Sequence, residues 1–72
     1  MARMKPPVSE WAADLRALRC RAGLTQVDLG MILGLAPSTV YRAERGAIKD
    51  AEVRERIEKW MARTRRAQQE AA

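Results

Sequence analysis

The sequence predicts one small all-α domain of four helices; a short fifth helix is the alternative. Apolar residues recur at the three- and four-residue spacing of helices, and no segment shows the alternation that strands need. β-branched and aromatic residues are also too few and too scattered for a sheet. Glycines stand where three helical patterns end, at the position that favours a left-handed backbone: Gly23, Gly34 and Gly46.

The first helix is predicted over residues 9–22, after a flexible basic arm at residues 1–8. Ser9 can accept hydrogen bonds from the amides of the first turn, and Pro6 and Pro7 disfavour an earlier start. One face of this helix is apolar at helical spacing and is expected to be buried: Trp11, Leu15, Leu18 and Ala22.

The second helix is predicted over residues 25–33. Thr25 and Asp28 have capping-box spacing, with Asp in place of the commoner Glu. Gly30 in the helix interior costs about 1 kcal/mol relative to Ala, so we expect a neighbouring helix to approach its backbone closely. The inward side chains are Leu29 and Leu33.

The third helix begins only three residues later and is predicted over residues 37–45, with Pro37 at the favoured first position. A connection this short forces a steep crossing and leaves one face of the third helix projecting outward. That face carries hydrogen-bonding and basic side chains of the kinds that contact bases and phosphates, and no acid: Ser38, Thr39, Tyr41, Arg42 and Arg45.

The fourth helix is predicted from about residue 50 to residue 66, and residues 67–72 are expected to fray. The chain therefore divides into the arm, a helical domain over residues 9–66 whose central two-helix unit spans residues 25–46, and a tail. The fourth helix is expected to bury Val53, Ile57, Trp60 and Met61.

Composition narrows the function. The 72 residues carry 14 Lys and Arg against 9 Asp and Glu, a net charge of +5, which favours an anionic partner such as nucleic acid, a membrane surface or an acidic protein. There is no His and a single Cys, which excludes a Cys/His zinc site and disfavours an enzyme; we expect no metal or other cofactor. No apolar run is long enough to span a membrane, and the mixed charges of the fourth helix disfavour a membrane-surface role.

One acidic residue falls on the inward side of the third helix. Glu44 follows Val40 by four residues, and a buried carboxylate without a cation is very unfavourable. Arg19 borders the buried stripe of the first helix and is the best candidate partner. The sequence therefore predicts an Arg19–Glu44 pair that holds the outer helix on the scaffold; the alternative is that Glu44 turns outward to Arg45 or solvent.

Residues 15–46, LRALRCRAGLTQVDLGMILGLAPSTVYRAERG, resemble the lambda-repressor and Cro type of helix-turn-helix domain. The matching features are the Arg before the Gly-Leu-Thr-Gln opening, the Leu-Gly turn, the Ser-Thr-Val start of the third helix and the final Glu-Arg-Gly. In this family the helix after the turn enters the major groove of DNA. The positions of Arg19 and Glu44 are also those of a familiar ion pair in the family.

The resemblance implies roles for individual residues. Gln26, at the opening of the second helix, and Arg45, near the end of the third, would hold backbone phosphates. Thr25, next to Gln26, is a further phosphate-binding candidate. The base-reading candidates are Ser38, Thr39, Tyr41 and Arg42. Two departures matter: Ala36 stands at the usual Ser/Thr cap, and Pro37 replaces a position that often carries a base-reading polar side chain.

The leading hypothesis is a dimeric, cytoplasmic repressor that reads a palindromic operator, because one recognition helix covers too few base pairs for useful discrimination. Its dimer contacts would be Ile57, Trp60 and Met61, if Trp60 and Met61 are only partly covered by their own chain. The alternative is an antitoxin-like or other protein-interaction module with the same fold. Val27, Met31 and Ile32 on the second helix either pack on the fourth helix or contact another molecule.

Overall fold

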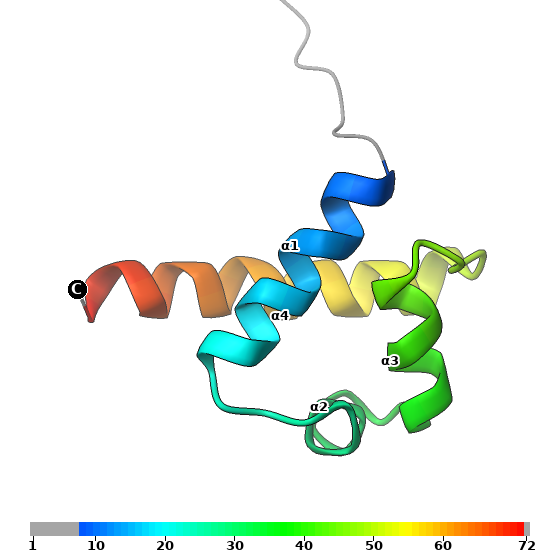
Figure 1. Ribbon diagram of the computed structural model, residues 1–72, viewed down its shortest axis with the longest axis horizontal. Coiled ribbons are helices and arrows are strands. Elements are labelled where there is room, and N and C mark those ends of the chain that lie inside the picture. Colours follow the sequence, from blue (N-terminus) through cyan, green and yellow to red (C-terminus); the bar gives the residue numbers. More distant parts are fainter. Residues whose placement is uncertain (1–7, 72) are drawn as a thin grey trace, which may run out of the picture.

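The chain folds into four helices and no strand within residues 8–71, the part that the computed structural model describes (Figure 1). The helices are α1 (Val8–Arg21), α2 (Gln26–Leu33), α3 (Pro37–Glu44) and α4 (Ala51–Glu70). This confirms the predicted all-α fold. The flexible arm predicted for residues 1–8 lies outside the described residues, apart from Val8 at the start of α1.

The predicted caps delimit the two central helices. The hydroxyl of Thr25 accepts from the Asp28 amide, and the Asp28 carboxylate accepts from the Thr25 amide, which completes the capping box of α2. Gly34 ends α2 with φ at 70°, a left-handed conformation that costs glycine little. As the departure at Ala36 implies, α3 begins without a side-chain cap, and Pro37 stands in its first turn.

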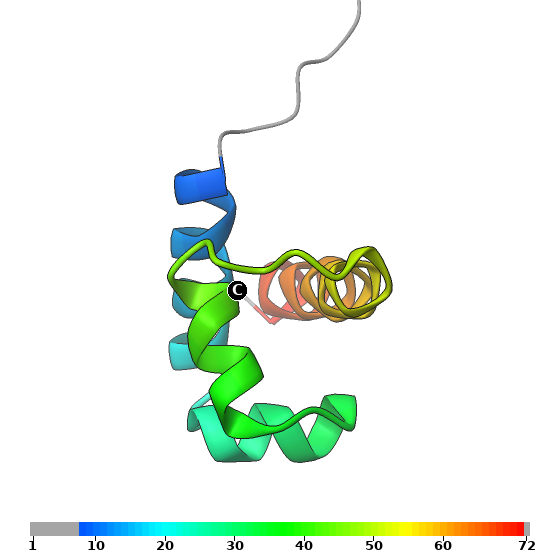
Figure 2. The ribbon, with the colours of Figure 1, turned by 90° about the vertical axis from the view of Figure 1, so that its right-hand side faces the viewer.

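The core draws on every helix. Each of the four contributes one fully buried aliphatic side chain: Leu15, Leu29, Val40 and Ile57. Burial of such a side chain contributes about 1.5–3 kcal/mol, so the four helices depend on one another for stability. In Figure 2, α4 is seen nearly end-on beside α1 and α3, with α2 crossing below them.

Helix α1 differs from the prediction at both ends. It begins at Val8, so Ser9 lies inside the first turn instead of capping the helix. It ends at Arg21, so Ala22 is exposed and Ala12 takes a place in the buried stripe beside Trp11 and Leu18.

Helix α4 extends to Glu70, four residues beyond the predicted end, so residues 67–70 are helical and not a frayed tail. One contact holds this extension against α1: the Gln68 side-chain amide donates to the Leu18 carbonyl at 3.2 Å. Just before the extension, Arg65 lies 3.7 Å from Asp14 of α1. Asp50 caps the start of the helix by accepting from the amides of Glu52 and Val53. Within residues 8–71, no helix combines the length and the apolar character that a membrane crossing requires.

Candidate nucleic-acid interface

The turn between α2 and α3 is tight because the backbone approaches itself closely at Gly30. A Cβ built on Gly30 would lie 2.5 Å from the carbonyl oxygen of Leu35, nearer than any real side chain comes. The close approach that the sequence predicts is therefore present, but the turn makes it and not a neighbouring helix. The Leu35 amide donates back to the Gly30 carbonyl at 2.8 Å, which fixes where α3 begins.

Helix α3 is tied to α1 by a charged pair. The Arg19 guanidinium donates to Glu44 through Nε, at 2.5 Å, and through Nη2, at 3.0 Å, and its Nη1 donates to the Leu24 carbonyl at 2.8 Å. The two side chains are only 12% and 4% exposed. The hydrogen bond to Glu44 raises the pKa of Arg19, so the guanidinium stays charged. This is the contact that the inward position of Glu44 predicts.

Gln26, the first residue of α2, joins this pair by donating to the Glu44 carboxylate at 3.3 Å. The side chain is half-buried, so its amide is held at the surface between α2 and α3. Thr25 is exposed beside it, where its hydroxyl already serves the cap of α2. Both phosphate-binding candidates of α2 are thus positioned by bonds within the domain.

A small cleft of about 200 Å³ lies where α1, α2 and α3 meet. It brings together two predicted phosphate-binding residues, Gln26 and Arg45, with the base-reading candidate Tyr41 and with Arg16, which the sequence reasoning did not single out. Three arginines and one glutamate line the cleft, so the Arg19–Glu44 pair leaves two positive charges uncompensated. Arg16 could have been found, because it precedes Arg19 by three residues and therefore shares its face of α1.

The outer face of α3 is open to solvent. Ser38, Arg42 and Arg45 are exposed, Tyr41 is half-exposed and Thr39 is partly covered. Arg45 donates to the Tyr41 hydroxyl at 3.3 Å, and its guanidinium lies 5.6 Å from the centre of the tyrosine ring. Within residues 8–71 the Arg42 side chain makes no hydrogen bond or ion pair, so it is free to contact a ligand.

The predicted dimer contacts are wrong, because their own chain covers them. Ile57, Trp60 and Met61 are 1%, 7% and 5% exposed and belong to the core, where α4 packs on α1 and α2. The condition on which this prediction rested, partial exposure of Trp60 and Met61, is not met. A dimer would have to use another surface.

A family model described as a helix-turn-helix domain matches residues 10–59, which is more than half of the chain. The match contains all of α1, α2 and α3 apart from the first two residues of α1, and it ends in the first half of α4. Comparisons with curated proteins and with solved structures find no significant match.

Proposed function

Because the chain belongs to the helix-turn-helix domain family, we propose that it is a sequence-specific regulator of transcription that binds double-stranded DNA. More narrowly, we propose the lambda-repressor and Cro type, on the resemblance of residues 15–46. In such domains the helix after the turn lies in the major groove, and its side chains contact base edges.

The observation that carries this proposal is the outward face of α3. Side chains that can donate or accept hydrogen bonds line this face. The Arg42 side chain forms no hydrogen bond or ion pair with any residue in the described range 8–71. The single acid of α3, Glu44, points away from this face to Arg19. A phosphate-bearing duplex would therefore meet no carboxylate from α3, and the base-reading candidates would reach the groove floor: Ser38, Thr39, Tyr41 and Arg42.

Phosphate contacts would flank this readout. Gln26 and Arg45 reach the surface at the start of α2 and just after the end of α3, and Arg16 lies beside them on α1. Groups from three helices around one cleft would fix the register of the domain on the duplex, while the bases supply specificity. Since each cation releases counterions on binding, affinity is expected to fall steeply as the salt concentration rises.

We further propose that the protein acts in the cytoplasm as a dimeric repressor on an inverted repeat. Two recognition helices related by a twofold axis would read half-sites about 34–36 Å apart, which gives the discrimination that one helix lacks. Trp60 and Met61 are buried in the core, so the dimer interface would use other residues.

The test is selection of bound sequences from a random duplex pool, with the wild-type chain and with Arg42→Ala. We expect a short inverted repeat, and a preference that relaxes at one base pair per half-site by about 1–3 kcal/mol in the variant. Arg66→Ala is the matched control, because Arg66 is an exposed arginine of α4 outside the α3 face. A selected motif that is identical for wild type and Arg42→Ala contradicts the assignment of readout to this face.

A further inference from the structure

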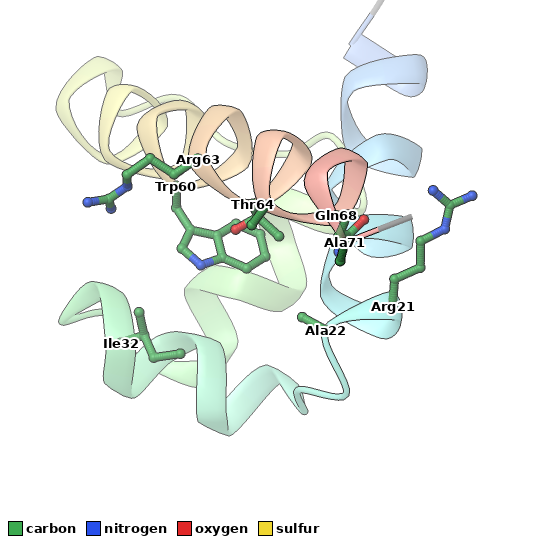
Figure 3. A pocket seen from close by; sticks show the side chains of 9 residues that line it. Arg21, Ala22, Ile32, Trp60, Arg63, Thr64, Gln68 and Ala71 are labelled. Carbon is green, nitrogen blue, oxygen red and sulfur yellow. The ribbon is translucent and has the colours of Figure 1, made fainter.

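An open groove of about 580 Å³ runs along the second half of α4 (Figure 3). Its other walls are the C-terminal ends of α1 and α2. Most of the surface inside it is apolar, and five of its nine lining residues have apolar side chains: Ala22, Ile32, Trp60, Ala67 and Ala71. No residue of α3 takes part.

The α4 wall of the groove is formed by side chains at helical spacing. Trp60, Thr64, Ala67 and Ala71 follow one another at spacings of four, three and four residues, so they form one stripe. The stripe spans about 16 Å, or three helical turns, and its side chains beyond Trp60 are small. It begins at residue 60, directly after the end of the family match at residue 59.

The α2 wall carries apolar side chains that the chain leaves uncovered. Ile32 lines the groove and is 56% exposed, and its neighbour Met31 is 77% exposed. Val27, one turn earlier, is 52% exposed. The sequence left open whether these residues pack on α4 or contact another molecule. Their exposure shows that any packing on α4 is partial, and that all three apolar side chains are largely open to solvent.

Charge decides which partner fits. Arg21 and Arg63 stand at opposite sides of the groove in Figure 3, and no Asp or Glu is among its lining residues. Within residues 8–71, neither arginine forms an ion pair. A second copy docked groove to groove would place these arginines against their own equivalents, and like charges in contact cost several kcal/mol.

We propose that the groove binds an amphipathic helical segment of another protein, with an apolar stripe between Asp or Glu side chains. The apolar stripe would cover Ile32 and the small residues of α4, and the carboxylates would meet Arg21 and Arg63. This mode of binding lays the apolar face of a helix into a groove. No residue of α3 lines the groove, so the groove lies outside the α3 face that we propose for DNA.

The probe is a synthetic helical peptide of about 14 residues, long enough to cover the stripe, with Leu at helical spacing and Glu on both flanks. Calorimetry on the full chain is expected to give saturable binding at one peptide per chain. The amide signals of Ala67 and Ala71 and the indole signal of Trp60 shift in the nuclear magnetic resonance spectrum. A peptide with Lys in place of Glu binds more weakly.

Two pairs of variants locate the site. Arg63→Glu is expected to weaken peptide binding about tenfold, whereas Arg66→Glu, the same charge change on the exposed surface of α4 outside the groove, leaves it within about twofold. Ile32→Ser weakens binding, and Met31→Ser, on the adjacent residue that does not line the groove, has the smaller effect. All four positions are exposed, so the fold is retained, which circular dichroism checks.

Three results would each overturn the proposal. These are the absence of saturable peptide binding, equal weakening by Arg63→Glu and Arg66→Glu, and a wild-type dimer that Arg63→Glu dissociates. The last would assign the groove to a second copy of the chain. None of these measurements involves DNA, so their outcome is independent of the DNA binding proposed for α3.

Discussion

Arg19 and Glu44 join the last turn of α1 to the last residue of α3 across 25 positions of the chain. Both carboxylate oxygens accept from the guanidinium, and Gln26 adds a third donor from α2. Three helices therefore meet at one carboxylate. The same contact removes the only acid of α3 from the face that we propose for DNA and orients that helix on its scaffold.

Replacement of Arg19 by Met is expected to lower the free energy of unfolding by about 3 kcal/mol. The substitution leaves the Glu44 carboxylate, 4% exposed, without its cation, and breaking one side of such a pair costs far more than the pair contributes. Thermal unfolding followed by circular dichroism measures the change. Lys59→Met is the control, because the Lys59–Glu55 pair is exposed on α4 and contributes at most about 0.5 kcal/mol. Unchanged stability of Arg19→Met would show that the pair is not effectively buried.

Gly30→Ala is expected to destabilise the fold by about 1–3 kcal/mol, although Ala is the better helix former by about 1 kcal/mol. The new methyl group meets the backbone carbonyl of Leu35 and cannot be accommodated by a side-chain rotation. Chemical denaturation gives the difference in free energy. Gly23→Ala is the comparison, since nothing lies within 4 Å of its Cβ position and only the cost of a left-handed backbone remains. Unchanged or increased stability of Gly30→Ala would mean that the turn yields to the added methyl group.

The carboxyl of Asp28 is expected to titrate below its ordinary value of 3.8, because hydrogen bonds from the Thr25 amide and hydroxyl lower its pKa. The pKa of Asp28 is lower in the folded protein than in the unfolded chain. The capping box therefore contributes its full stabilisation at pH values above the unfolded-state pKa, and this stabilisation is lost as the pH falls through the folded-state pKa. Titration by nuclear magnetic resonance measures the value. Thr25→Ala should return the pKa only part of the way, because the backbone amide remains; an unshifted Asp28 in the wild type would argue against the box.

Arg16→Ala is expected to weaken binding to all duplexes about equally and to reduce the slope of affinity against salt by about one counterion. The residue lines the cleft with Gln26, Tyr41 and Arg45, and the base-reading candidate Arg42 is not among the lining residues. Binding measured by fluorescence anisotropy at several salt concentrations tests this. Arg42→Ala serves as the contrast, since its loss should depend on the base sequence. If Arg16→Ala lowered the affinity only for duplexes that carry the selected motif, Arg16 would contact a base and not a phosphate.

The helical pattern in the sequence predicts most of the fold because the relevant signals are local. The caps at Thr25 and Asp28, the glycine that ends α2 and the proline that opens α3 act through their nearest neighbours in the chain. Glu44 is the exception that sequence reasoning still reached. Its place four residues after Val40 puts a charge on an apolar side, and such a charge calls for a cation from another helix.

The errors concern which helix covers which side. Periodicity predicted that Ile57, Trp60 and Met61 are buried, and this is confirmed; the error was to offer the same residues as dimer contacts, because α1 and α2 leave them almost no exposed surface. Periodicity also placed Ala22 in the core, whereas the crossing of the helices buries Ala12 and leaves Ala22 at the rim of the groove. The end of α4 was underestimated because its last turns are held by Gln68 and Arg65 against α1, contacts between residues about 50 positions apart.

By itself, the sequence determined four helices, the caps of the second helix and the three-residue turn, since hydrogen bonding and side-chain spacing near each residue settle these locally. It also determined the charged pair that joins the first helix to the third, because a carboxylate on an inward face requires a cation. Only the tertiary structure decided the cleft that adds Arg16 to Gln26 and Arg45, and the apolar groove between α4 and the ends of α1 and α2. Each is bounded by more than one helix, and the position of one helix on another depends on how all their side chains pack together.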